Sequence, residues 1–286
     1  EMKKGRLMMH LTLPSWVKKH YLEFNSIDDV PQEVFDRIKK GFERLHTETP
    51  LVSVVVIAYN EEKTILKSLS SLSELSSKYP IEVIVSNNNS KDRTQEILDR
   101  CGVKSVFQPL QGVGFARDAG LQIAKGVYHL CADADSIYPA SYVDEMIQPM
   151  VNGKAVATYG RVSFLPDGEK SRPALAVYEF FKDIAIGLRA VKRPELVAGG
   201  ASLGFYTEQA KQIGWRTDVK RGEDGQMILA MKKTGNIVMV KSPGSRIWTT
   251  ARTLDADGSF ATMIWKRVKK EFSRLHFYFT THKQNA

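Results

Sequence analysis

Two aspartates that follow an apolar run are well suited to bind a metal ion. Asp133 and Asp135 are one residue apart, and residues 127–132 before them are typical of a buried strand. Hard divalent cations such as Mg²⁺ and Mn²⁺ take one or two carboxylates together with phosphate oxygens of a substrate. The alternative is that Asp135 caps a helix expected over residues 140–150.

A second pair of acids, Glu223 and Asp224, stands at the start of a helix that we expect to run to about residue 233. A carboxylate can accept the proton that an attacking hydroxyl loses, provided that it lies within hydrogen-bond distance. The alternative is that both acids stabilise the start of the helix, where the backbone dipole is positive. The pair is therefore a candidate catalytic base with a structural alternative.

Arg117 is a candidate ligand for a diphosphate. It follows Gly112 and Gly114 and is expected to open a helix over residues 117–125. Glycines allow the backbone to approach a ligand closely, and a guanidinium can bind phosphate oxygens through two hydrogen bonds. The alternative is an ordinary surface ion pair between Arg117 and Asp118.

Strands and helices alternate along the part of the chain that carries these residues. We expect strands over 51–58, 81–85, 103–107 and 127–132, and helices after Asn60, which caps the first, and over 92–100 and 117–125. This alternation predicts a mostly parallel sheet with right-handed crossovers, whose ligands bind at the carboxyl ends of the strands. Polar residues follow three of the strands, at 59–62, 86–92 and 133–135, so we expect one site there.

Composition and charge narrow the class of protein. The chain has 286 residues, of which 43% are hydrophobic and 26% charged, so disorder, collagen and coiled coil are excluded for the whole chain. The net charge of +9 favours an anionic partner such as nucleotide phosphates, nucleic acid or acidic lipid. Two cysteines, no signal peptide and no run of about 20 apolar residues predict a cytoplasmic protein without a spanning helix.

Residues 1–49 form a predicted N-terminal helical extension. Its clearest element is a helix over residues 31–45, which Asp29 can cap and in which Pro31 suits the first turn. The sequence then divides into a catalytic domain over residues 50–250 and a C-terminal segment over residues 251–286.

The order of these motifs resembles a known family. The chain contains Ala-Tyr-Asn-Glu-Glu, Asn-Asn-Asn-Ser-Lys-Asp-Arg-Thr, Gly-x-Gly-x-Ala-Arg-Asp-Ala-Gly, Ala-Asp-Ala-Asp, Gly-Gly-Ala and Gly-Glu-Asp-Gly, in that order. This series is similar to that of the family 2 nucleotide-sugar glycosyltransferases over about residues 50–250. The resemblance implies a GT-A fold, which is a Rossmann-like α/β fold with a mostly parallel central sheet flanked by helices.

The resemblance assigns the donor nucleotide to four positions near the strand ends and one on the next helix. It places Ala58, Tyr59 and Glu61 around the base and ribose, Asn87 at the base, and Arg117 at the diphosphate or ribose. The family usually has an aspartate at the position of Asn87. An amide can both donate and accept a hydrogen bond, as uracil requires, whereas guanine with two adjacent N–H donors suits a carboxylate better. This difference favours a UDP-sugar.

The resemblance also implies the chemistry of transfer. It assigns donor and metal binding to Asp133, the metal to Asp135, catalysis to Glu223 and Asp224, and contacts with the substrate or diphosphate to Gly200 and Arg252. Asp224 matches the usual catalytic base of inverting members. Arg252 lies in a stretch similar to Thr-Ser-x-Arg-Arg, although Thr253 replaces the second arginine. The cofactor implied is Mn²⁺ or Mg²⁺.

The function predicted from these residues is metal-dependent transfer of a sugar from a nucleotide-diphosphate donor to an acceptor hydroxyl. Gln226 does not begin the Gln-x-x-Arg-Trp motif of processive members, so we expect a non-processive enzyme. If Asp224 lies on the acceptor side, the transfer inverts the anomeric configuration, with retention as the alternative. The acceptor would be a glycan or a lipid-linked sugar in cell-surface polysaccharide or glycolipid synthesis.

Two other functions stay open on the sequence alone. A nucleotidyltransferase that makes sugar nucleotides shares the α/β layout, but the acidic Glu61 and Glu62 replace its basic phosphate loop. A non-enzymatic nucleic-acid-binding protein would explain the charge of +9, yet the sequence has no zinc spacing or recognition motif. We therefore expect no nucleic acid partner.

The C-terminal segment has an amphipathic pattern. Apolar residues recur at three- and four-residue steps between Ile264 and Phe279, and basic residues such as Lys266 and Arg274 flank them. Such a helix can lie in an anionic membrane interface, as a peripheral anchor on the cytoplasmic face. The alternative is that the stripe docks on the catalytic domain.

Overall fold

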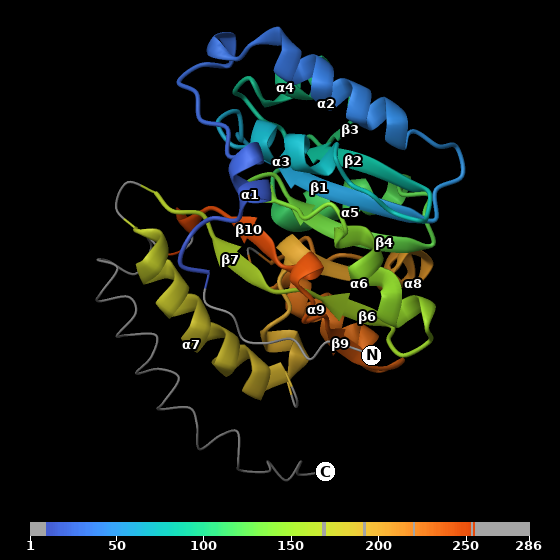
Figure 1. Ribbon diagram of the computed structural model, residues 1–286. Helices are drawn as coiled ribbons and strands as arrows, with labels where there is room; N and C mark the ends of the chain where they lie inside the picture. The colour runs from blue at the N-terminus through green and yellow to red at the C-terminus, as the bar shows by residue number, and fades with distance from the viewer. Residues whose placement is uncertain (1–9, 168–169, 191–192, 220, 253, 255–286) are drawn as a thin grey trace, which may run out of the picture.

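The computed structural model describes residues 10–167, 170–190, 193–219, 221–252 and 254. A central sheet of seven strands runs through the molecule in the order β3-β2-β1-β4-β8-β6-β9 (Figure 1). The strands are β1 (Val52–Ala58), β2 (Ile81–Asn87), β3 (Lys104–Phe107), β4 (Tyr128–Asp133), β6 (Ala157–Tyr159), β8 (Leu203–Tyr206) and β9 (Ile237–Met239). The predicted α/β class with a mostly parallel sheet is confirmed, since β8 alone in this sheet pairs antiparallel with its neighbours.

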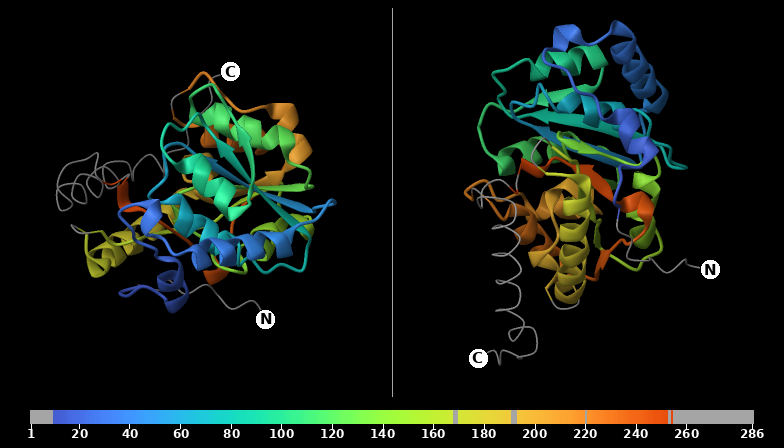
Figure 2. Two further views of the ribbon diagram at one scale, coloured as in Figure 1. Left: turned by 90° about the horizontal axis from the view of Figure 1, so that it is seen from above. Right: turned by 60° about the vertical axis from the view of Figure 1, so that its left-hand side comes forward.

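Helices cover both faces of the sheet, which is why its central strands are mostly apolar. Val54 of β1 points into one large core with α2 (Gln32–Leu45), α3 (Ile65–Leu72), α4 (Thr94–Cys101) and α6 (Tyr142–Val151). Val55 points to the other face, where α5 (Val113–Ile123) contacts β1 and β2. Figure 2 shows these layers from two further sides.

A smaller sheet lies beside the carboxyl end of the central one. It pairs β5 (Ser136–Ile137), β10 (Ile247–Thr249) and β7 (Val162–Phe164) in the order β5-β10-β7. Because β5 follows β4 after only two residues, this sheet brings residues near 250 next to the Asp133–Asp135 turn. The helices α7 (Arg172–Ala190), α8 (Thr207–Ile213) and α9 (Glu223–Met231) complete this half of the molecule.

The N-terminal extension contains α1 (Ser15–His20), a short turn of 3-10 helix, η1 (Ile27–Asp29), and α2. Phe35 and Ile38 of α2 are fully buried in the same core as β1. The extension therefore packs on the sheet. The boundary near residue 50 and the extent of the catalytic domain over residues 50–250 stay predictions.

Three local predictions are wrong. Asp29 does not cap α2, because its carboxylate accepts from the backbone N–H of Ser26 in the preceding turn. Asn60 caps no helix: its φ of 52° is left-handed, its Oδ1 accepts from the N–H of Lys91, and α3 begins only at Ile65. Helix α5 begins at Val113, so Arg117 lies in its second turn instead of opening it. Within the described ranges, no helix is long and apolar enough to cross a membrane.

Candidate active site

A cavity of about 660 Å³ opens at the carboxyl ends of β1 and β4. Its lining includes nine of the predicted site residues, which come from segments up to 166 positions apart: Ala58, Tyr59, Glu61, Arg117, Asp133, Asp135, Gly200, Glu223 and Asp224. The prediction that the polar strand ends meet in one place is therefore confirmed for β1 and β4. The end of β2 contributes Asn88.

Arg117 is the electrostatic centre of this cavity. Its side chain is buried, and it forms ion pairs with Asp133 (Nη2 to Oδ1, 3.1 Å) and Asp224 (Nε to Oδ1, 3.3 Å). The acids hold the pKa of the guanidinium above its ordinary value, against the opposing effect of burial. The alternative pairing with Asp118 is wrong, since that carboxylate accepts from Gln122.

Polar atoms at this centre are not fully hydrogen-bonded within the protein. Among the described residues, Nη1 of Arg117 is buried without a hydrogen-bond partner, and Nε of Arg117 and Oδ1 of Asp224 contact each other only as an ion pair at 3.3 Å. Buried polar groups are normally paired, so these atoms indicate a place where substrate oxygens and hydrogens bind.

Asp224 is oriented from a second direction by the backbone of Gly200, whose N–H donates to Oδ2 at 2.8 Å. A Cβ at position 200 would lie 1.8 Å from Nη2 of Arg117 and 2.6 Å from Oδ1 of Asp224. Only glycine therefore allows the backbone to approach both side chains. Glu223, the neighbouring acid, is buried, and burial raises its pKa.

Asp133 and Asp135 lie on the turn after β4 and differ in their partners. Asp133 contacts Arg117, and burial raises its pKa to about 6 although Arg117 opposes the shift. Asp135 instead accepts from the hydroxyls of Thr249 (3.0 Å) and Thr250 (2.5 Å), which come from the end of β10. Neither threonine was predicted as a site residue from the sequence, where the one signal for them is their position beside Arg252.

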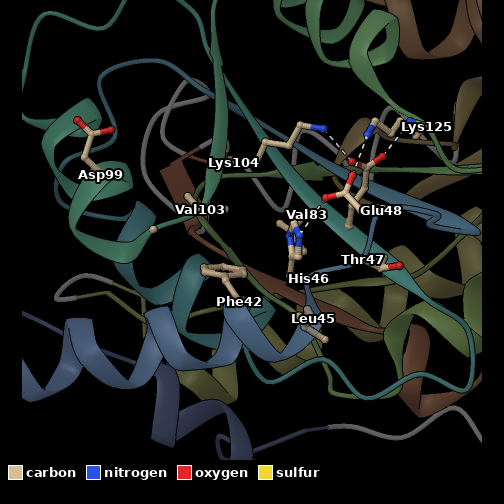
Figure 3. A pocket seen from close by; sticks show the side chains of 12 residues that line it. Phe42, Leu45, His46, Thr47, Glu48, Val83, Asp99, Val103, Lys104 and Lys125 are labelled. Atoms are coloured by element: carbon tan, nitrogen blue, oxygen red, sulfur yellow. Dashed lines mark hydrogen bonds and ion pairs between the residues drawn. The ribbon is translucent and has the colours of Figure 1, made fainter.

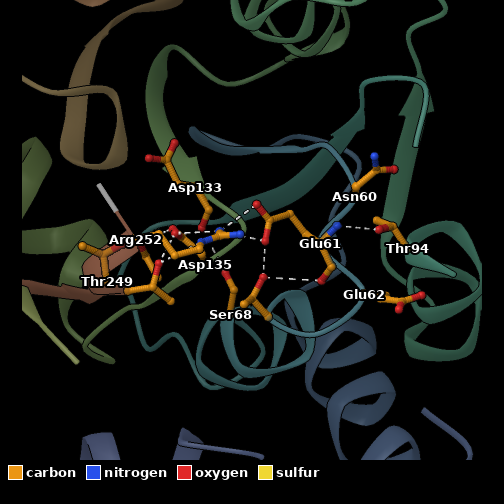
Figure 4. Close-up of polar contacts among 12 residues, drawn as sticks. Asn60, Glu61, Glu62, Ser68, Thr94, Asp133, Asp135, Thr249 and Arg252 are labelled. Carbon is orange, nitrogen blue, oxygen red and sulfur yellow. Dashed lines mark hydrogen bonds and ion pairs between the residues drawn. The ribbon is translucent and has the colours of Figure 1, made fainter. Parts of the chain in front are cut away.

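Arg252 lies between Asp135 and Glu61, as Figure 4 shows. Its Nη2 is 2.9 Å from Oδ2 of Asp135 and 2.8 Å from Oε1 of Glu61. Burial raises the pKa of Glu61, and the arginine partly offsets that effect. The structure thus brings Arg252 to the predicted metal ligand.

The donor set at this turn fits a divalent cation that is also bound by a diphosphate. No group of three or more His, Cys, Asp or Glu side chains able to hold a metal occurs in the described part of the chain. Asp133 and Asp135, however, both line the cavity beside Arg117. Two carboxylates are sufficient when phosphate oxygens and water complete the coordination shell.

Asn87 is placed differently from the prediction. Its side chain is 1% exposed and is not among the described residues that line the cavity. Its Nδ2 donates to Gln95 and its Oδ1 accepts from the N–H of Ser90. Since both ends of the amide are used within the protein, Asn87 does not favour uracil as the base of the donor. Asn88 reaches the cavity and accepts from the N–H of Gly112.

A second cavity, of about 630 Å³, lies at the opposite ends of the strands (Figure 3). Its two lysines are already paired, Lys104 with Glu82 and Lys125 with Glu48. Ligands of parallel α/β sheets bind outside the carboxyl ends of the strands. The cavity at Asp133 is therefore the candidate active site.

Known structures of similar fold carry nucleotide sugars. TarS from S. aureus with UDP-GlcNAc superposes with a TM-score of 0.52 at 20% identity, covering 70% of this chain and 58% of that one. The mannosyltransferase PcManGT from Pyrobaculum calidifontis, with GDP-Man and Mn²⁺, gives 0.56 at 18% identity, covering 87% and 78%. Glucosyl-3-phosphoglycerate synthase from Mycobacterium tuberculosis, with Mn²⁺ and UDP-Glc, gives 0.52 at 20% identity, covering 86% and 85%. These similarities show a GT-A fold.

Sequence comparison gives the family. The probable glycosyltransferase YdaM of Bacillus subtilis is 29% identical over 306 aligned positions, which cover 96% of this chain and 70% of YdaM. The chain spans only 30–48% of the length of three other curated relatives that it matches. The family model for glycosyl transferase family 2 matches residues 53–211, more than half of the chain. The predicted resemblance is confirmed: this chain belongs to glycosyl transferase family 2.

Proposed function

We propose that this protein transfers a sugar from a nucleotide-diphosphate donor to the hydroxyl of an acceptor. The observation that carries the proposal is that Asp133, Asp135, Arg117 and Asp224 line one cavity at the carboxyl ends of the strands. The reaction needs stabilisation of a departing diphosphate and a base for the acceptor, and this set supplies both. Family membership favours this reaction over the synthesis of sugar nucleotides.

The charged side chains act on the leaving group. Asp133 and Asp135 would hold a divalent cation, whose charge stabilises the diphosphate as the glycosidic bond breaks. Arg117 adds a buried positive charge, and its Nη1 has no hydrogen-bond partner among the described residues. We propose Mn²⁺ as the cation, with Mg²⁺ as the alternative, because two proteins of the same fold bind Mn²⁺.

Asp224 is the proposed base. Asp224 lines the cavity, and its carboxylate is fixed by Arg117, whose Nε is 3.3 Å from Oδ1, and by Gly200, whose N–H donates to Oδ2. A carboxylate fixed in this way can take the proton of the acceptor hydroxyl as that oxygen attacks the anomeric carbon. Attack from the side opposite the diphosphate inverts the anomeric configuration. We propose a single, non-processive transfer.

The donor is proposed to be a UDP-sugar. Two of the three structures of similar fold described above contain uridine nucleotides, and one contains GDP-Man. Ala58 and the partly exposed ring of Tyr59 line the end of the cavity beside β1, where a base can stack on the ring. Glu61 is proposed to contact the ribose once Arg252 releases it.

The acceptor is proposed to be a glycan or a lipid-linked sugar, in polysaccharide or glycolipid synthesis on the cytoplasmic face of a membrane. Peripheral association would rest on the basic residues between positions 266 and 274, which lie outside the described residues. Each basic residue near an anionic surface contributes about 1 kcal/mol to binding. Sedimentation with anionic liposomes at low and high salt tests this part.

Thermal unfolding of the full chain with UDP-, GDP- and dTDP-sugars, each with and without Mn²⁺, tests the proposed donor. We expect a UDP-sugar with Mn²⁺ to raise the melting temperature most, because a ligand that binds only the folded state stabilises it. A larger rise in melting temperature with a GDP-sugar would overturn uracil as the nucleobase of the donor. Turnover of a nucleoside triphosphate with a sugar phosphate would overturn the proposed reaction.

A further inference from the structure

Helix α7 exposes a continuous apolar face. All of its residues are described, and its exposed positions are Pro173, Val177, Phe181, Ile184 and Leu188. The last four are 42–55% exposed and recur at three- and four-residue steps, so they form one stripe along the helix. None of these exposed positions is charged. A contiguous apolar surface of this kind marks an interaction site.

Four charged residues of α7 point inward and fix its orientation. Arg172 forms a bidentate ion pair with Glu179 (2.8 and 2.6 Å), and Asp183 pairs with Arg246, which directly precedes β10. Lys182 donates to a backbone carbonyl of β7 at 2.6 Å. Rotation of the helix would break these buried pairs, which is strongly destabilising. The apolar stripe is therefore held toward the outside, as the position of α7 at the edge of the molecule shows (Figure 2).

The chain beyond the described residues starts at this helix. Leu254 is buried in a small cluster with Leu175 and Tyr178 of α7. Nine residues, 255–263, then precede the amphipathic pattern. Extended, they reach about 30 Å, and a helix of the length of α7 spans about 28 Å. The following segment can therefore reach every point of the stripe.

The following segment matches the stripe in length and chemistry. Its apolar residues are Ile264, Trp265, Val268, Phe272, Leu275 and Phe279. As a helix, this pattern spans about 22 Å, compared with about 16 Å for the stripe from Val177 to Leu188. Apolar surfaces of similar length, held close by a short linker, bury one another at little cost in chain entropy.

We propose that residues 264–279 form a helix whose apolar side covers the stripe of α7. The basic residues of the segment, such as Lys266 and Arg274, then face away from α7. They remain available for the anionic surface proposed above, but the apolar side chains do not enter the bilayer. This packing does not depend on the proposed glycosyl transfer.

Hydrogen–deuterium exchange of the full chain, without lipid, tests the packing. We expect the amides of residues 264–279 to exchange slowly in the wild type. In the double variant Phe181→Asn with Leu188→Asn, we expect them to exchange at least about tenfold faster, because the covering contact is lost. The amides of β1 and β4 should keep their wild-type rates, which shows that the variant is folded.

Phe107→Asn is the matched control, because Phe107 is 57% exposed at the edge strand β3 and is not part of α7. It should leave exchange over residues 264–279 unchanged. Fast exchange of these residues in the wild type, or an unchanged rate in the double variant, overturns the proposal. If the amides of residues 264–279 are protected only when anionic vesicles are present, the stripe binds a membrane. If their protection rises with protein concentration, the stripe binds a second copy of the chain. Either result also overturns the proposal.

Discussion

The Nη2 atom of Arg252 lies 2.9 Å from Oδ2 of Asp135, the carboxylate proposed to hold the metal. A cation and the guanidinium therefore compete for one oxygen. Replacing Arg252 with Met should raise the affinity of the donor-free protein for Mn²⁺ by up to about fivefold, the value of a partly exposed ion pair. Isothermal titration calorimetry measures this affinity. Arg252→Lys, which keeps the charge, should stay near the wild type, and weaker binding by Arg252→Met would contradict the competition.

Asp135→Ala should abolish the Mn²⁺-dependent part of donor binding. The variant loses one of the two carboxylates at the metal position, while Arg252 keeps its contact with Glu61. Calorimetric titration with a UDP-sugar, with and without Mn²⁺, gives the part of the donor affinity that depends on the metal. Asp118→Ala is the control, because Asp118 lies on α5 and accepts from Gln122 outside the cavity lining. A metal effect of normal size in Asp135→Ala would remove this residue from the site.

Asp224→Asn should leave donor binding intact and lower the turnover by about 10²- to 10⁴-fold, the usual contribution of a general base. The amide keeps the shape of the side chain and an oxygen for the N–H of Gly200. Steady-state kinetics and donor titration together separate the two effects. Asp218→Asn is the control, because Asp218 is an exposed acid paired with Arg216. Near-normal turnover of Asp224→Asn would falsify the role as base.

Arg117→Met should destabilise the protein by about 3 kcal/mol, because Asp133 and Asp224 lose their shared counter-charge. Unfolding in urea measures this difference. Adding Asp133→Asn should recover part of the loss, since one of the two uncompensated acids is removed. Arg216→Met, at an exposed ion pair with Asp218, should change stability by less than about 1 kcal/mol. A loss no larger than in that control would show that Arg117 does not hold the two acids together.

Lys182 gives the protein a pH dependence at alkaline pH. Burial lowers the pKa of its ammonium from the ordinary value of 10.5 to about 8, against the opposing effect of Asp183. Between these values the unfolded chain binds a proton that the folded protein has lost, so the free energy of unfolding rises with pH. Below pH 8 the ammonium is charged in both states, and its burial reduces stability.

Lys182→Met should therefore be more stable than the wild type at pH 7, and the difference should shrink as the pH approaches 10. Unfolding in urea between pH 7 and pH 10 measures the difference in the free energy of unfolding between the two proteins. The other titrating groups are the same in both proteins, so their effects cancel in this difference. The exposed Lys63→Met serves as the surface control. A difference for Lys182→Met that stays constant with pH would mean that the pKa of Lys182 is not lowered.

The sequence alone determined the layered fold and the position of the site in it. Continuous apolar runs predict β1, β2 and β4, because strands buried on both faces need apolar residues at every position. The helix predicted after Asn60 is present as α3, whose four apolar residues, Ile65, Leu66, Leu69 and Leu72, are fully buried. Polar residues that end an apolar strand are a local signal, so Asp133 and Asp135 could be predicted as part of the site.

Only the tertiary structure decided which side chains meet which partners. Asn87 has the right place at a strand end, but Gln95 and Ser90 use both ends of its amide. Arg252 reaches Asp135 across 117 positions because β10 pairs with β5. A sequence pattern records neighbours within a few residues, whereas these contacts depend on how distant segments pack. The same reason explains why Asp183 of α7 faces inward, since it pairs with Arg246, which is 63 positions away in the sequence.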